Sequence, residues 1–174
     1  MLVEHQEKAI EKGLLTLWII WAGIMGSLLI YVFICHQFGD QIRRDINPNF
    51  PLPLMRNILY GIGIITLFLT HFLKRFMLGG TFSGTLSKPS RSDQHSNQPP
   101  FLAKYSTALI VSLALSESIG IYGLVLFLLG DSFQTLYIFI GISALAIYVH
   151  RPKREELETL ALAMQTDKAP TTEV

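Results

Sequence analysis

Charged side chains are scarce in this sequence of 174 residues. Asp, Glu, Lys and Arg together make up 16% of it, whereas globular domains carry about a quarter, and half of the residues are apolar. The single cysteine, Cys35, excludes an internal disulfide bond. A formal net charge of +1 gives no indication of a nucleic-acid partner, and we expect none. The composition therefore indicates lipid surroundings rather than water.

The sequence also lacks the motifs of common enzyme and metal sites. It contains no HExxH, no CxxC and no phosphate-binding loop, and no Ser/His/Asp or Cys/His set falls at one depth of the apolar segments. His36 and Asp40 lie one helical turn apart, but two ligands are too few to define a metal site. We therefore predict no enzyme activity, no catalytic residue, no metal site and no cofactor other than a proton or a sodium ion.

Four apolar blocks are each long enough to cross a hydrocarbon core about 30 Å thick. We predict an all-α integral membrane protein whose four transmembrane helices cover residues 14–36, 54–78, 101–130 and 133–150. Only residues 131 and 132 separate the last two blocks, which predicts a tight antiparallel hairpin. The first two blocks are expected to form a second antiparallel hairpin.

The positions of the basic residues predict the orientation of these helices. Lys and Arg in short loops are retained on the cytoplasmic side of a membrane. Of the 14 lysines and arginines, Arg43, Arg44 and Arg56 fall on one side of the predicted bundle and all the others fall on the opposite side. We therefore place both termini in the cytoplasm and the protein, as a multi-pass protein, in the inner (plasma) membrane of a cell.

Four segments outside the apolar blocks complete the predicted organisation. Residues 1–13 form a cytoplasmic N-terminus, and residues 37–53 form an outer loop that ends in a proline-rich turn. Residues 79–100 are rich in Gly, Ser, Thr, Pro, Asn and Gln, so they predict a flexible cytoplasmic loop. Residues 151–174 form a cytoplasmic amphipathic helix and a tail.

The cytoplasmic helix has an apolar face opposite an acidic one. Leu157, Leu160, Ala161 and Met164 recur at helical spacing against neighbouring glutamates. One interpretation is a docking surface for a partner or for the membrane, although acidic side chains disfavour anionic lipid. We favour the other interpretation, a helix that folds back on the bundle or frays.

One ionisable residue, Glu117, lies in the middle of the third apolar block. Lys104 and Gly130 mark the ends of that block, and Glu117 is thirteen residues, or about 20 Å of helix, from each. A carboxyl at this depth cannot reach water by snorkelling, so it must be protonated, be paired with a cation, or face a wet cavity. The histidines lie nearer the ends of their blocks, so we expect neutral partners, and Thr66 lies at a matching depth.

Small residues accompany Glu117 along the same block. Four of them recur at helical spacing, which predicts close approach of another helix: Ser112, Ser116, Gly120 and Gly123. In the first block, Gly23 and Gly26 repeat the spacing of Gly120 and Gly123. A purely structural interpretation is that this stripe is a packing seam and that Glu117 is a protonated side chain hydrogen-bonded across it.

The segment around Glu117 resembles a known family. Gln98-Pro99 precedes Glu117, which lies eighteen residues after Pro99 in the stretch ALSESIGIYGLV, residues 114–125. This pattern is similar to the second helix of ATP synthase subunit c, a rotary ATPase proteolipid. The resemblance covers about residues 58–130, with the second apolar block in the place of the glycine-rich inner helix. Beyond that range the chain is similar only in outline to small four-helix membrane proteins of bacterial type.

The resemblance implies a role for residues near the carboxyl. In subunit c the central carboxylate carries the transported proton or sodium ion, which assigns this role to Glu117. In sodium-binding members a serine directly after the carboxylate and a tyrosine five positions on support the ion, which correspond here to Ser118 and Tyr122. Together with Thr66, these residues form the ion-binding site that we predict.

Two functions remain open from the sequence. The first is a small polytopic membrane protein whose Glu117 binds or relays protons, or less readily sodium, in the manner of the subunit c hairpin. The alternative is a non-transporting accessory or scaffold subunit that uses the small-residue stripe and the cytoplasmic helix to bind other membrane proteins. For both, the expected partners are the lipid bilayer and either further copies of this chain or other membrane subunits.

Overall fold

The computed structural model describes residues 4–42, 51–78 and 100–166, and the secondary structure over these residues is entirely helical. Five helices follow one another along the chain: α1 (Glu4–Ile42), α2 (Leu52–Leu78), α3 (Pro100–Leu128), α4 (Phe133–Val149) and α5 (Arg154–Thr166). The prediction of an all-α fold is confirmed. The predicted flexible loop lies almost entirely outside the described residues.

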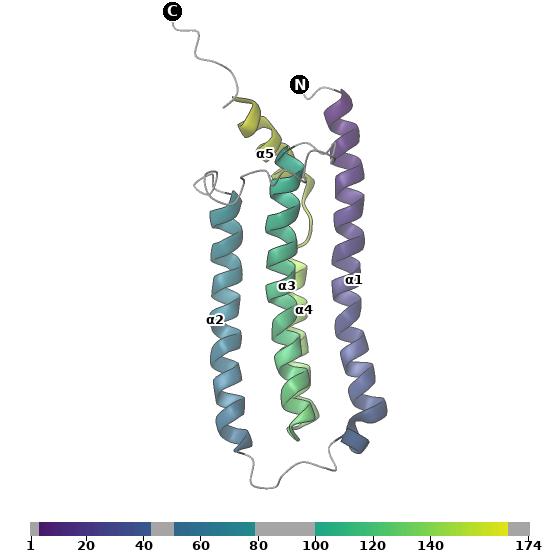
Figure 1. The fold of residues 1–174 in the computed structure, drawn as a ribbon, viewed down its shortest axis with the longest axis vertical. Coiled ribbons are helices and arrows are strands. Elements are labelled where there is room, and N and C mark those ends of the chain that lie inside the picture. Colours follow the sequence, from purple (N-terminus) through teal and green to yellow (C-terminus); the bar gives the residue numbers. More distant parts are fainter. Residues whose placement is uncertain (1–3, 43–50, 79–99, 167–174) are drawn as a thin grey trace, which may run out of the picture.

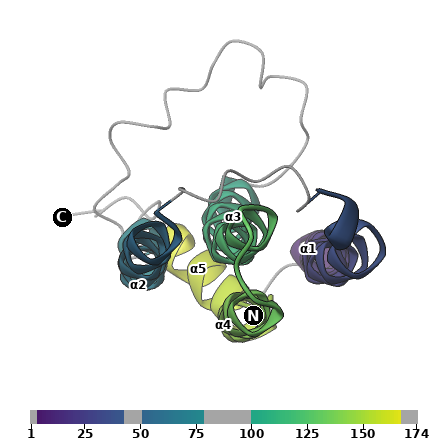
Figure 2. The same cartoon turned by 90° about the horizontal axis from the view of Figure 1, so that it is seen from below.

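The four long helices lie side by side with their axes nearly aligned (Figure 1). α1 and α3 run in one direction, and α2 and α4 run in the opposite direction. The view along the bundle shows α3 between α1 and α2, with α4 packed against α3 (Figure 2). α1 and α2 are therefore separated by α3 and do not pack as a hairpin of their own, whereas α3 and α4 do.

Three helices carry apolar stretches of membrane-spanning length: Ile10–Gly39, Leu52–Phe76 and Phe101–Leu128. α4 is shorter, with 17 residues, and α5 follows it at a bend of 48°. The described chain thus has three helices long and apolar enough to cross a membrane, or four if α4 and α5 are counted as one bent span. Large apolar side chains such as Phe33, Phe68 and Phe72 are exposed on α1 and α2, as expected of surfaces that face lipid.

The ends of the helices follow local chemistry. Gly130 adopts a φ of 100°, a conformation that favours glycine, and it lies in the turn that follows the end of α3 at Leu128. The Ser132 side chain caps α4 by accepting a hydrogen bond from the Thr135 amide at 3.4 Å. At its C-terminal end α1 continues to Ile42 and so includes the first six residues of the predicted outer loop, because this segment contains no proline. Gly39 within it lies close to the Phe127 ring of α3.

α5 folds back against the bundle. Leu157, Leu160 and Ala161 are buried in one cluster with apolar residues of α1 and α3. Tyr105 on α3 accepts a hydrogen bond from the Lys153 amide at 2.9 Å and donates one to the Lys153 carbonyl at 3.2 Å, which fixes the start of α5. The apolar face of this helix is therefore used within the chain itself.

Candidate functional site

The carboxyl group of Glu117 lies between α3 and α1. Tyr31 on α1 donates a hydrogen bond to Glu117 Oε1 at 2.8 Å, and the Ser27 hydroxyl lies 2.5 Å from the same oxygen. Ser27 and Tyr31 are four residues apart, so they share one face of α1. Glu117 is the eighteenth of the 29 residues of α3, and its side chain is partly buried.

The Ser27 hydroxyl has two neighbours that can accept its single hydrogen. One is Glu117 Oε1, and the other is the Ile24 carbonyl oxygen at 2.7 Å. A hydroxyl has one donor hydrogen and two acceptor lone pairs. If Glu117 is ionised, the Ser27 hydroxyl can donate to the carboxylate. If Glu117 is protonated, its carboxylic acid can donate to the Ser27 oxygen, and the Ser27 hydrogen then points to the Ile24 carbonyl. The site can satisfy either protonation state without moving a helix.

No cation neutralises this carboxyl within the part of the chain that the structure describes. The ion pairs there lie at the two ends of the bundle: Arg56 with Asp131 at 3.8 Å at one end, and Lys74 with Glu156 at 3.0 Å at the other. Nor do those residues contain a group of three His, Cys, Asp or Glu side chains placed to hold a metal ion. The carboxyl of Glu117 is therefore surrounded by neutral groups, as its depth in the sequence predicts.

The three residues predicted to line the site with Glu117 lie elsewhere. The Ser118 hydroxyl donates to the Leu115 carbonyl at 2.7 Å, and the Thr66 hydroxyl donates to the Ile62 carbonyl within α2 at 2.8 Å. Tyr122 packs in an apolar cluster that includes Leu59 of α2. Successive residues of a helix are rotated by about 100°, so Ser118 and Tyr122 cannot share the face of Glu117. Within this single chain the structure does not bring them to the carboxyl.

The small residues of α3 lie at its contacts with α4 and α1. Ser143 on α4 donates to the Ser116 carbonyl at 2.7 Å, and Ser112 and Ser116 are both buried. A β-carbon added to Gly123 would lie 2.5 Å from Phe139 Cβ, and one added to Gly120 would lie 2.7 Å from Leu28 Cδ2. These close approaches place α4 and α1 directly against α3.

Gly23 and Gly26 differ from these four residues. A β-carbon added to either would meet no atom within 4 Å. The Gly-x-x-Gly spacing on α1 is thus the same as that on α3, but it faces open space and contributes no helix contact in this chain.

Sequence reasoning missed Ser27 and Tyr31. Ser27 lies among apolar residues in the first block, and Tyr31 follows it at the spacing of one helical turn. Two hydroxyl side chains on one helix face were the available signal, but the sequence does not reveal which helix that face meets. His36, considered above as a metal ligand, has its Nε2 2.6 Å from the Tyr137 hydroxyl on α4.

Comparisons of this chain with protein family models, with curated proteins and with solved structures give no match.

Proposed function

We propose that this chain is a membrane protein in which Glu117 binds and releases a proton between α1 and α3. The observation that carries the proposal is the pair of hydroxyl groups, from Ser27 and Tyr31, on one oxygen of a carboxyl that forms no ion pair with any described residue. Ionisable residues buried in membranes are most often functional because their burial is energetically unfavourable. The resemblance of residues 114–125 to subunit c supports the same chemistry.

The proposal includes a topology. α4 follows α3 by a short turn and lies along it, so we propose that α4 crosses the membrane as a fourth span despite its 17 residues. Flanking residues can shorten the apolar length that a helix requires. The basic residues Lys12, Lys74 and Lys153 lie toward the end of the bundle that carries α5, and the positive-inside rule places that end in the cytoplasm.

A proton fits the site better than sodium does. A sodium ion that leaves water must replace its hydration shell with protein oxygens. Ser27 and Tyr31 supply two hydroxyl oxygens beside the carboxyl, whereas the Ser118 and Thr66 hydroxyls are directed to carbonyls of their own helices. Proton binding requires only the carboxyl and a neighbour that can exchange donor and acceptor roles, as Ser27 can.

A second candidate function is an accessory or scaffold subunit that transports nothing. It is favoured by the open setting of Gly23 and Gly26, where another membrane helix could approach α1 closely. Under this proposal Glu117 serves only to hold α1 against α3. Gly23→Leu would then disrupt association with a partner in mild detergent, whereas Glu117→Gln would leave association intact.

Labelling with a hydrophobic carbodiimide tests the leading proposal. The reagent reacts with protonated carboxyl groups in apolar surroundings, and peptide mass spectrometry identifies the modified residue. We expect Glu117 to be labelled, labelling to fall as pH rises, and Glu117→Gln to remove it. Glu156→Gln, at the end of the bundle that carries α5, is the matched control and should leave the labelling of Glu117 unchanged. An unlabelled Glu117 at low pH would contradict the proposal, and protection by sodium would indicate sodium binding.

A further inference from the structure

A second polar site lies at the end of the bundle that carries α5. A cavity of about 310 Å³ is formed there between the last turns of α2, the end of α4 and the start of α5. Its lining contains mostly basic or histidine side chains and a single carboxylate: His71, Lys74, Arg75, Val149, His150, Lys153 and Glu156. The basic and histidine side chains thus come from α2 and from the segment that connects α4 to α5.

Glu156 compensates only part of this positive charge. Its carboxylate lies 3.0 Å from Lys74 Nζ and 3.7 Å from Lys153 Nζ, so two lysines share one acid. Arg75 and His71 make no ion pair or hydrogen bond through their side chains with any residue in 4–42, 51–78 or 100–166, and both are exposed. The cavity therefore has a surplus of positive charge, and its lining includes the exposed guanidinium of Arg75.

His150 adds a buried imidazole to the lining of the cavity. His150 caps the C-terminus of α4, outside its helical residues, and is buried. Its Nδ1 donates a hydrogen bond of 2.7 Å to the Ala146 carbonyl oxygen.

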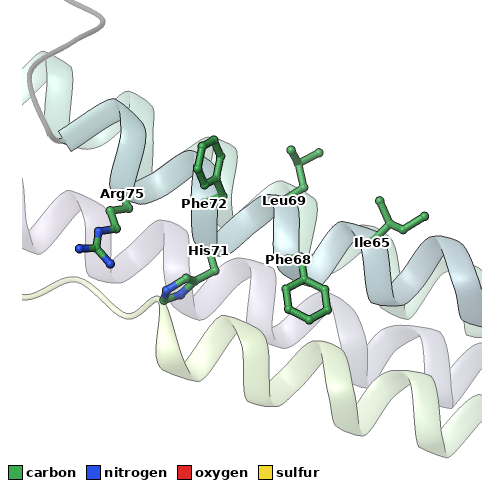
Figure 3. Close-up of a pocket in the computed structure, with 6 residues that line it drawn as sticks. All are labelled: Ile65, Phe68, Leu69, His71, Phe72 and Arg75. Atoms are coloured by element: carbon green, nitrogen blue, oxygen red, sulfur yellow. The ribbon is translucent and has the colours of Figure 1, made fainter.

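An apolar groove continues from the cavity along α2. Its lining consists of Ile65, Phe68, Leu69 and Phe72, and His71 and Arg75 line both the groove and the cavity (Figure 3). Phe68 is 75% exposed and Phe72 is 66% exposed, so these rings face the surroundings of the bundle rather than its core. A charged cavity at the end of an apolar groove matches a molecule with an anionic head and a long apolar chain.

We infer that this cavity and groove bind one acidic phospholipid, with its phosphate held by Arg75, Lys153 and Lys74 and one acyl chain lying along Phe68 and Phe72. Arginine binds phosphate oxygens in a bidentate way, and lysine binds them as a point charge. Basic pockets between membrane helices at the cytoplasmic boundary are suited to anionic headgroups. The continuity of groove and cavity favours a lipid over a soluble phosphate, which would leave the apolar groove unused. The site is separate from Glu117 and does not depend on its role.

Native mass spectrometry of the full chain in mild detergent tests this inference. The probes are phosphatidylglycerol and phosphatidylcholine with identical acyl chains, together with glycerol phosphate as a soluble headgroup. We expect phosphatidylglycerol to bind more tightly than phosphatidylcholine, and glycerol phosphate to compete poorly. Arg75→Gln and Lys153→Gln should each weaken phosphatidylglycerol binding about fivefold, the effect of one basic residue near a membrane surface.

Lys12→Gln is the matched control, because Lys12 is an exposed lysine on α1 at the same end of the bundle but outside the cavity. It should leave the affinity unchanged. Equal binding of the two lipids, or an equal loss of affinity in Lys12→Gln, would overturn the inference. Strong competition by glycerol phosphate would also overturn it and would indicate a site for soluble phosphate. Unchanged melting temperatures of the exposed variants will show that they fold.

Discussion

Tyr31 on α1 donates a hydrogen bond of 2.8 Å to Oε1 of Glu117 on α3. The two residues are 86 positions apart in the sequence, and they meet because α1 and α3 run side by side in the same direction. This contact links the outer helix α1 to the central helix of the bundle through a carboxyl group.

Tyr31→Phe should increase carbodiimide labelling of Glu117 at a fixed pH near neutrality. The substitution removes a donor that stabilises the ionised carboxylate, so a larger fraction of Glu117 is expected to be protonated. The extent of labelling, measured by peptide mass spectrometry, checks this.

Tyr122→Phe is the matched control for this experiment. Tyr122 lies in the cluster with Leu59 of α2, and its hydroxyl makes no hydrogen bond to Glu117 in the structure. If Tyr122→Phe changed the labelling and Tyr31→Phe did not, the arrangement implied by the resemblance to subunit c would be right and the pairing with α1 would be wrong.

Ser27→Ala should destabilise the bundle, and the size of the effect should depend on Glu117. One hydrogen bond contributes about 0.5 to 1.5 kcal/mol to stability, and Ser27→Ala removes one from Glu117 while the bond from Tyr31 remains. We therefore expect Ser27→Ala to lower the free energy of unfolding in the native background and to have little effect in a Glu117→Leu background. Denaturant titration in detergent measures both.

Ser118→Ala is the matched control for this double-mutant cycle of Ser27→Ala and Glu117→Leu. The Ser118 hydroxyl bonds to the Leu115 carbonyl of its own helix, so its removal should have the same effect in both backgrounds. Additive effects of Ser27→Ala and Glu117→Leu would show that the two side chains are not energetically coupled.

Gly123→Ala should loosen the contact between α3 and α4. The added β-carbon would lie 2.5 Å from Phe139 Cβ and 3.3 Å from the Leu136 carbonyl oxygen, and neither atom can rotate away. Overpacking of this kind costs about 1 to 3 kcal/mol, which exceeds the gain of about 0.5 to 1 kcal/mol from replacing a helical glycine with alanine. A lower melting temperature in detergent is the expected result.

Gly141→Ala is the matched substitution on α4, where an added β-carbon meets nothing within 4 Å. It should leave the melting temperature unchanged or raise it slightly. A Gly123→Ala protein as stable as the Gly141→Ala protein would mean that α3 and α4 are not in close contact at this position.

The sequence was sufficient to locate the helices, because apolar length and periodicity are local properties. The third block illustrates this: its observed bounds, Pro100–Leu128, lie within two residues of the predicted 101–130. The central position of α3 could not be predicted in this way. Hydropathy gives the depth of a residue in the bundle but not the helix that its side chain faces.

The same limit explains the candidate site. The isolation of Glu117 from cations was predictable from its depth, whereas its pairing with Ser27 and Tyr31 depends on how α1 is rotated against α3. Gly23 and Gly26 show the same limit, because they share the spacing of Gly120 and Gly123 yet face open space. Local motifs indicate which contacts a helix can make, and only the packing decides which ones it does make.

Infrared titration of the protein in liposomes tests most directly whether Glu117 exchanges a proton. The spectrum of Glu117→Gln is subtracted from that of the unaltered protein at each pH of the titration. We predict a carboxylic acid C=O band from Glu117 at low pH that is replaced by carboxylate bands as the pH rises. A band that stays constant across the whole range would contradict reversible proton binding and would leave Glu117 as a structural link between α1 and α3.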